Sequence, residues 1–312
     1  MPKKQVGATR PINDRKSPKR KKEKDQIRFG TVGSPQSTPK SGTPAAIDHA
    51  HTLGLDHLEI AWVRSVTATE TTCAEIKSAA EQANISLSIH APYFINLNSQ
   101  TTELMEKSDA RLLKAARVGY LAGARDIVFH PGSYHKQPPE QVYERVKEKL
   151  AEIRGILDEE NVNVILRPET MGKQAVFGTL DELLQLSKDI PGVLPCIDWA
   201  HLHARTGDGG FNTYEEFSAA LTSVKDMLGD TGLKDLHCHL SGIEYTQKGE
   251  KKHLPLDQAD MAYRELLQAI VDSEAAGTIA IEAPDPFHVA DCLTLQAVYR
   301  QIRDDGAAKR NL

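Results

Sequence analysis

The sequence predicts a single closed (β/α)8 barrel of the α/β class, and three observations support this fold. Short runs rich in β-branched residues alternate with longer amphipathic stretches from residue 27 to residue 304. Eight such strand–helix units follow one another, as an eight-stranded parallel barrel requires. The length of 312 residues suits one domain of this kind.

The predicted strands are β-branched and apolar runs, each followed by an amphipathic stretch. They span 27–32, 57–62, 86–90, 126–130, 162–168, 193–198, 233–239 and 278–284. The predicted helices carry apolar residues at helical spacing and span 43–53, 69–83, 101–122, 138–160, 179–189, 213–228, 257–275 and 288–304. A long loop separates the seventh strand from its helix. Alternation in this order indicates a parallel barrel and not an open antiparallel sheet.

Charge divides the chain into a tail and a body. We expect a disordered basic tail at 1–26, the barrel at 27–305 and a short C-terminal tail at 306–312. The first 28 residues hold eleven Lys or Arg and three Asp or Glu, a charge of +8, although the whole chain carries −5. The tail is polar and lacks apolar periodicity. It either clamps nucleic-acid phosphates without regard to sequence or acts as a solubilising or localisation arm.

Cysteine usage and hydropathy bear on the cellular compartment. No apolar run reaches the length of a membrane span, and the N-terminus lacks a secretory signal. The four cysteines, Cys73, Cys196, Cys238 and Cys292, are scattered and form no C-x-x-C pair. We therefore expect a reduced, cytoplasmic location without membrane attachment, in which the thiols are small core residues.

Eight residues of metal-binding type lie at, or just beyond, the ends of predicted strands. They are His90, His130, Glu169, Asp198, His201, His239, His253 and Glu282. Because the C-terminal strand ends and the following loops form the active-site face of such barrels, all eight should converge on one rim. Imidazole and carboxylate together favour Zn, Mn or Fe, and this number of ligands suits a small cluster of ions. Such a cluster indicates hydrolysis of a phosphate ester.

Two further polar residues lie within predicted strands. His237 shares a side of its strand with His239 and is interpreted as a core or supporting residue. Glu59 lies midway along the second strand and is either a buried polar partner or a site residue.

Several segments of the chain resemble the endonuclease IV family from about Ile27 to Arg303. They are His90-Ala-Pro-Tyr93, Phe129-His130-Pro-Gly-Ser133, Cys196-Ile-Asp198-Trp-Ala-His201 and Ile281-Glu282. The segments that begin at Phe29 and Pro168 resemble an archaeal branch of that family. The resemblance implies a TIM barrel with zinc ions that cuts double-stranded DNA on the 5′ side of abasic or damaged sites during base excision repair.

The resemblance also implies a role for each ligand. Glu169 would bridge two zinc ions, of which His90 and His130 would complete one. Asp198, His239 and Glu282 would complete the other, and His201 with His253 would hold a third. Glu282 would orient or deprotonate the attacking water, so Glu169 and Glu282 are the candidate catalytic residues. Tyr93 and Arg64 are the candidate DNA contacts. Mn²⁺ is an alternative to zinc, and we expect a monomer.

Lys251 departs from the family pattern, which has an Asp two residues before the His of the third site. A cation does not ligate zinc and repels it, so the third ion is in question. Glu250 or Glu244 are the substitutes that the sequence offers.

Two other functions remain open. The quartet Glu169, Asp198, His239 and Glu282 also resembles the single-metal site of xylose-isomerase-like sugar isomerases and epimerases, which do not need His90, His130 or His201. A non-catalytic protein that recognises DNA ends is the third hypothesis, favoured only by Lys251.

Overall fold

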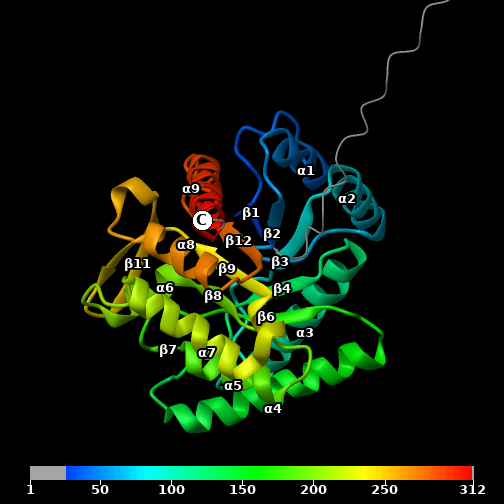
Figure 1. The fold of residues 1–312 in the computed structure, drawn as a ribbon. Coiled ribbons are helices and arrows are strands. Elements are labelled where there is room, and N and C mark those ends of the chain that lie inside the picture. The colour runs from blue at the N-terminus through cyan, green and yellow to red at the C-terminus, as the bar shows by residue number, and fades with distance from the viewer. Residues whose placement is uncertain (1–25, 311–312) are drawn as a thin grey trace, which may run out of the picture.

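The structure, a computed structural model, describes residues 26–310 and contains an eight-stranded parallel barrel (Figure 1). The strands are β1 (Ile27–Val32), β2 (His57–Ala61), β3 (Ser86–His90), β4 (Asp126–Phe129), β6 (Ile165–Pro168), β8 (Cys196–Asp198), β9 (Leu236–Leu240) and β12 (Gly277–Ile281). They are ordered β6-β4-β3-β2-β1-β12-β9-β8. Parallel bridges from Leu166 to Val193 and from Glu169 to Cys196 close the ring. The predicted fold is confirmed, while the tail expected at 1–26 lies outside the described residues apart from Gln26.

Helices surround the strands (Figure 1). They are α1 (Thr43–Thr52), α2 (Glu70–Ala83), α3 (Thr102–Leu121), α4 (Pro139–Glu159), α5 (Leu180–Asp189), α7 (Tyr214–Leu233), α8 (Tyr263–Asp272) and α9 (His288–Arg310). Threonine side chains cap α2, α3, α5 and α7, and Thr179 and Thr213 form capping boxes with Glu182 and Glu216. Within the described residues, none of the helices has the length and hydropathy of a membrane span.

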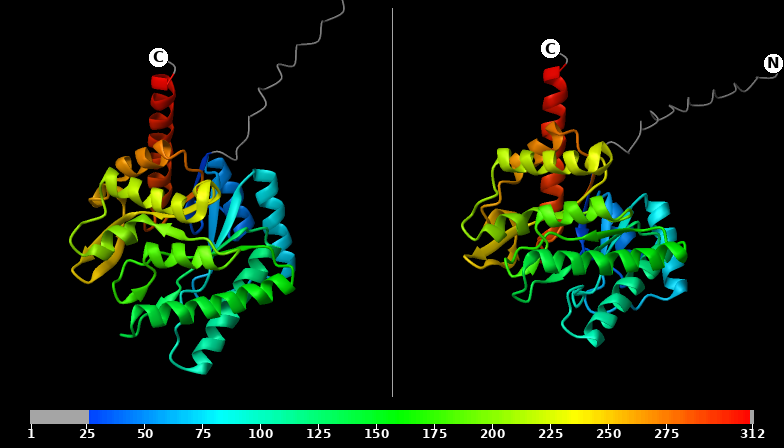
Figure 2. Two further views of the ribbon diagram at one scale, coloured as in Figure 1. Left: turned by 60° about the horizontal axis from the view of Figure 1, so that its bottom comes forward. Right: turned by 90° about the horizontal axis from the view of Figure 1, so that it is seen from below.

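Three helix boundaries differ from the prediction. Helix α7 continues to Leu233 through a kink at Gly229, where a φ of 72° suits glycine. Helix α8 begins at Tyr263, after a short 3₁₀ turn (η2, Leu256–Gln258). Helix α9 runs to Arg310 and extends beyond the barrel in both views of Figure 2, so the predicted boundary at residue 305 falls within a helix.

The loops after the strands contain elements that the sequence did not indicate. These are helix α6 (Trp199–Thr206), the hairpin of β10 (Gly242–Thr246) and β11 (Gly249–Leu254), and a two-stranded sheet of β5 (Gly132–Ser133) and β7 (Val176–Phe177). Each follows the C-terminal end of a barrel strand. They therefore build up the face on which the candidate ligands lie.

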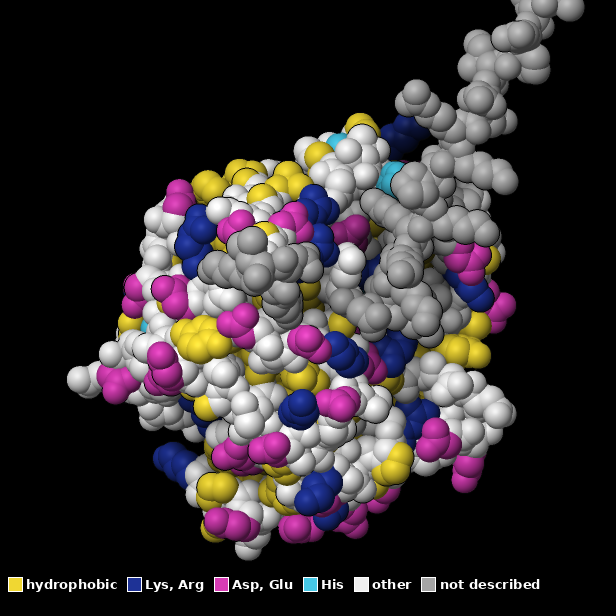
Figure 3. All heavy atoms as spheres, in the orientation of Figure 1, with side chains coloured by type: hydrophobic (Ala, Val, Ile, Leu, Met, Phe, Trp, Pro, Cys, Tyr) yellow, Lys and Arg dark blue, Asp and Glu magenta, His cyan; other side chains and the backbone are white. Residues whose placement is uncertain are grey.

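A buried arginine braces the opposite end of the barrel. The Arg167 guanidinium is 1% exposed and donates to Asp126 Oδ1 at 2.7 Å and to Asp235 Oδ1 at 3.0 Å. These pairs join β6 to β4 and to the segment before β9. Elsewhere, positive and negative side chains are interspersed on the face drawn in Figure 3, so its visible charge has no single sign.

Candidate metal centre

All eight candidate ligands meet at the C-terminal end of the barrel. His90, His130, His201, His253 and Glu282 line a cavity of about 670 Å³. Glu169, Asp198 and His239 are 0% exposed. The strand ends bring together residues from positions 90 to 282, which lie on six different strands or on the loops that follow them.

The carboxylate of Glu169 lies at the centre of this group. Its Oε2 atom is 3.2 Å from His90 Nε2 and 3.3 Å from His130 Nε2. Its Oε1 atom is 3.2 Å from His201 Nδ1 and 3.4 Å from His239 Nδ1. The two oxygens of this carboxylate thus face different histidines, Oε2 facing His90 and His130 and Oε1 facing His239, as those of a bridging ligand do.

Hydrogen bonds fix which ring nitrogen is free to bind a metal in two of these histidines. His90 Nδ1 lies 3.0 Å from the carbonyl oxygen of Ala91, and His201 Nδ1 lies 2.9 Å from that of Thr170. A carbonyl only accepts, so Nδ1 carries a proton and Nε2 is the nitrogen left to bind a metal ion. His253 has a similar support, because its Nδ1 lies 2.6 Å from Ser241 Oγ.

The surroundings of the Asp198 carboxylate indicate whether these residues can bind a metal ion. Its Oδ1 atom caps α6 by accepting from the His201 backbone N–H at 2.7 Å. Its Oδ2 atom is buried and has no hydrogen-bond partner. An unpartnered buried carboxylate oxygen is costly unless a cation compensates it. The residues therefore fit a divalent ion, and imidazole with carboxylate suits zinc or manganese.

Seven of the eight candidate ligands form three overlapping sets, in each of which one ligand atom from every residue lies within 4.8 Å of the others, whereas His130 belongs to none of these sets. The sets are His90, Glu169, His239 and Glu282; Glu169, Asp198, His201 and Glu282; and His201, His253 and Glu282. Glu282 belongs to all three, with Oε1 3.5 Å from His239 Nδ1 and Oε2 3.6 Å from His253 Nε2. In these sets Asp198 is grouped with His201, whereas the family pattern assigns it to His239.

The electrostatics of the centre couple carboxylates to imidazoles. Burial opposes ionisation of Glu169, but the charge of His239 and hydrogen bonds from His130, His201 and His239 hold its pKa well below the usual range. Burial likewise opposes protonation of His90, yet its hydrogen bond with Glu169 and the nearby carboxylates raise its pKa to about 9. Protons thus occupy positions that a metal ion would take, and metal binding would release them.

A β-bulge determines which side chain of β11 faces the expected site of the third metal ion, beside His201 and His253. Glu244 pairs with Lys252 and Tyr245 with Glu250, so Lys251 is the extra residue of the strand. Lys251 Nζ is hydrogen-bonded to Glu244 and is absent from the cavity lining, which contains Glu250. Glu250 Oε2 lies 3.6 Å from His201 Nε2. The expected conflict between Lys251 and a third ion is therefore absent, because the lysine points elsewhere.

The two candidate DNA contacts have different positions. Tyr93 is 46% exposed, lines the cavity and packs against Phe94, with ring centroids 4.1 Å apart and ring planes tilted by 35°. Arg64 is exposed, but its neighbour Val63, not Arg64, lines the cavity. Lys173 also lines it, and no sequence pattern singled this residue out because it lies in the loop after β6 and is not a metal-binding type.

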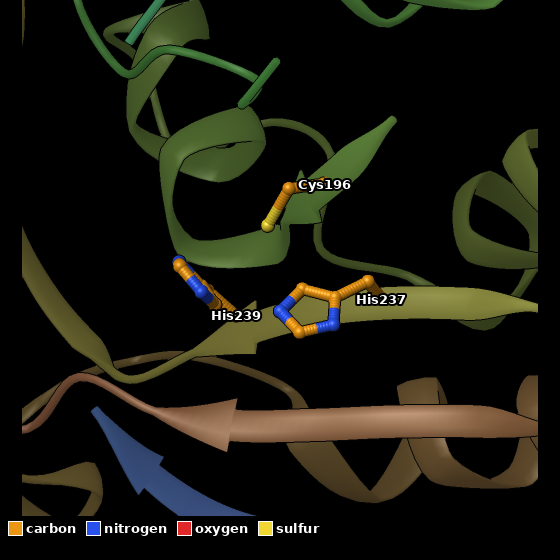
Figure 4. Close-up of side chains that lie close together, drawn as sticks. All are labelled: Cys196, His237 and His239. Carbon is orange, nitrogen blue, oxygen red and sulfur yellow. The ribbon is translucent and has the colours of Figure 1, made fainter. Parts of the chain in front are cut away.

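A second group of polar residues lies beneath the ligands. Cys196 and His237 face His239 in the barrel interior (Figure 4). Burial raises the pKa of the Cys196 thiol well above its usual value, so it stays protonated and is a poor ligand. His237 Nε2 is instead 2.9 Å from Glu59 Oε2, which agrees with its predicted supporting role.

The fold and this site define a class of protein, and sequence comparison agrees. The chain belongs to the xylose isomerase-like TIM barrel family, which it matches over residues 47–300. It is 41% identical over 256 residues to an uncharacterized protein of Methanocaldococcus jannaschii, covering 82% of this chain and 91% of that one.

Relatives with a stated activity are more distant. The chain is 31% identical over 162 residues to a probable endonuclease 4 of Staphylococcus carnosus, covering 50% of this chain and 52% of that protein. It thus matches about half the length of that relative. The structure of endonuclease IV from Thermus thermophilus superposes with a TM-score of 0.69 at 23% identity, covering 88% and 99% of the two chains. A D-tagatose 3-epimerase-like protein superposes with a TM-score of 0.66 at 18% identity, covering 90% and 100%. These two likenesses establish the fold alone.

Proposed function

We propose that this chain is a metal-dependent endonuclease that hydrolyses the DNA phosphodiester bond 5′ to abasic sites. The observation that carries the proposal is the position of Glu169, whose Oε2 atom faces His90 and His130 while its Oε1 atom faces His239. A single-metal isomerase has no need of His90, His130 and His201 around the same carboxylate. The similarity to probable endonuclease 4 proteins over half of the chain also supports it.

The residues of the chain suggest how the reaction is divided. His90, His130, Glu169, Asp198, His201, His239, His253 and Glu282 would hold zinc, or alternatively manganese, with Glu250 as a further ligand at the third position. Bound ions would supply positive charge against the phosphate oxygens and lower the pKa of water. Glu282, whose side chain is 15% exposed at the edge of the buried ligands, would orient the attacking water and accept its proton.

Other groups at the mouth of the cavity suit a DNA strand. The exposed Tyr93–Phe94 pair offers an aromatic face to a base or deoxyribose beside the lesion. Lys173 provides a positive charge for a flanking phosphate. A basic tail at 1–26, if it binds DNA, would add affinity that does not depend on sequence.

The test is cleavage of a duplex oligonucleotide that contains one abasic site, together with metal analysis of the purified protein. We expect incision on the 5′ side of the site, and its loss in His90→Gln and His130→Gln. His51→Gln, at an exposed position on α1, is the matched control and should cleave normally. Conversion of a ketose, without incision and with full activity in His130→Gln, would establish the single-metal isomerase or epimerase instead.

A further inference from the structure

Glu59 is a buried carboxylate with no role in the assignments above. It lies on β2, inside the barrel, and is 0% exposed. Its Oε2 atom accepts from Ser88 Oγ at 2.5 Å and lies 2.9 Å from His237 Nε2. Its Oε1 atom lies 3.0 Å from His239 Nε2, although their angle is not that of a regular hydrogen bond. Burying a charge costs free energy even when polar groups surround it, so we expect Glu59 to have a role beyond packing.

His239 differs from the other histidines of the centre in what supports it. The Nδ1 atoms of His90 and His201 are hydrogen-bonded to backbone carbonyls, and the Nδ1 atom of His253 is hydrogen-bonded to a serine hydroxyl. Of these four, only His239 has behind it a carboxylate that is not itself a candidate ligand, at the nitrogen opposite the one that faces Glu169 and Glu282. A carboxylate behind an imidazole fixes its tautomer and makes its other nitrogen a stronger ligand.

A polar column holds Glu59 in place. Ser88 Oγ, which donates to Glu59, also lies 2.9 Å from His57 Nε2, and His57 Nδ1 lies 2.9 Å from Ser86 Oγ. Ser88 and Ser86 lie two residues apart on β3, so their side chains share the interior side of the strand. The column therefore fixes the position of the Glu59 carboxylate under His239 from below, independently of any ligand in the cavity.

We propose that Glu59 is a positioning residue that orients His239 and strengthens its Nδ1 atom as a ligand for one metal ion of the cluster. The inference rests on the proposed metal centre but not on the substrate. A change of Glu59 should therefore weaken the binding of the ion beside His239 more than the binding of the ion beside His90 and His130. Glu59 touches no substrate and acts only through the imidazole.

The experiment measures metal content and chelator competition for the wild type, Glu59→Gln and Glu59→Asp. Glu59→Gln keeps an acceptor of similar size but removes the charge, whereas Glu59→Asp keeps the charge but withdraws it from His239. We expect either variant to weaken one metal equivalent about 10- to 100-fold and to leave the others within about twofold. Glu59→Asp serves alone if Glu59→Gln does not fold. His51→Gln, at an exposed position on α1, is the control and should retain all metal.

Thermal unfolding of the metal-free proteins separates positioning from a purely structural role. Unchanged metal affinity in both Glu59 variants, with only a lower melting temperature, would overturn the proposal, as would equal weakening of every ion. A wild-type protein that binds no metal would instead refute the proposed metal centre, so the two failures are distinguishable. A cobalt-substituted protein gives an independent readout, since its visible spectrum should change in Glu59→Gln and not in His51→Gln.

Discussion

Glu250 Oε2 lies 3.6 Å from His201 Nε2, at the position where a family carboxylate would be expected two residues before His253. In a regular strand, residues two apart share a face, which would put Lys251 beside His253. The bulge in β11 makes Lys251 the extra residue, and its side chain pairs with Glu244 instead. The third position therefore retains a carboxylate, supplied from a different place in the sequence.

This arrangement predicts that Lys251→Asp has little effect on metal content. The Lys251–Glu244 pair is exposed and screened by water, so it contributes little to stability and its loss should be tolerated. Glu250→Gln should instead reduce the occupancy of the third ion and make it easy to remove by mild chelation. Metal analysis after dialysis against a weak chelator checks both variants. Higher third-ion occupancy in Lys251→Asp would mean that the lysine does face the site.

Glu169→Gln should remove more than one equivalent of metal, because its two carboxylate oxygens face different histidines of the centre. An amide has only one oxygen and cannot serve both sides. Metal analysis of the variant and of His51→Gln, as control, gives the stoichiometry. Loss of one ion or none would favour a mononuclear centre and the isomerase alternative.

Arg167→Met should destabilise the barrel by about 3–5 kcal/mol, because it leaves the buried Asp126 without its hydrogen-bonded counter-charge, whereas Asp235 keeps its pair with Arg125. Arg117→Met is the matched control, since Arg117 pairs with Glu160 at the surface and should cost about 1 kcal/mol or less. Denaturant unfolding measures both. Equal effects would mean that water reaches Arg167 and screens its pairs.

His57 should make the protein less stable in acid. Burial and the charge of His237 lower its pKa from 6.5 to about 3, so the folded state leaves it neutral where the unfolded state binds a proton. Stability therefore falls as pH decreases through this window, by up to about 1.4 kcal/mol per pH unit from this group. His57→Asn removes the titrating group. The free energy of unfolding of this variant should therefore change less with pH between about pH 6 and pH 4 than that of the wild type. An identical slope in both proteins would contradict it.

The sequence alone determined the barrel and the convergence of its ligands. Strand and helix patterns are local, and a parallel barrel carries every strand end to the same face, so residues as distant as His90 and Glu282 were correctly placed together. The resemblance to the family assigned roles to these residues, but it could not show whether the Lys251 side chain faces the third metal site.

Only the tertiary structure decided the rest, because it depends on pairing between distant segments. The bulge that replaces Lys251 by Glu250 arises from how β10 and β11 align, which no local pattern in β11 specifies. The ring nitrogen that each histidine presents depends on partners such as Thr170, 31 residues away from His201. The contact between Glu59 and His239 joins β2 to β9, two strands that are far apart in the sequence. The supporting role of Glu59 therefore follows only from the closed barrel.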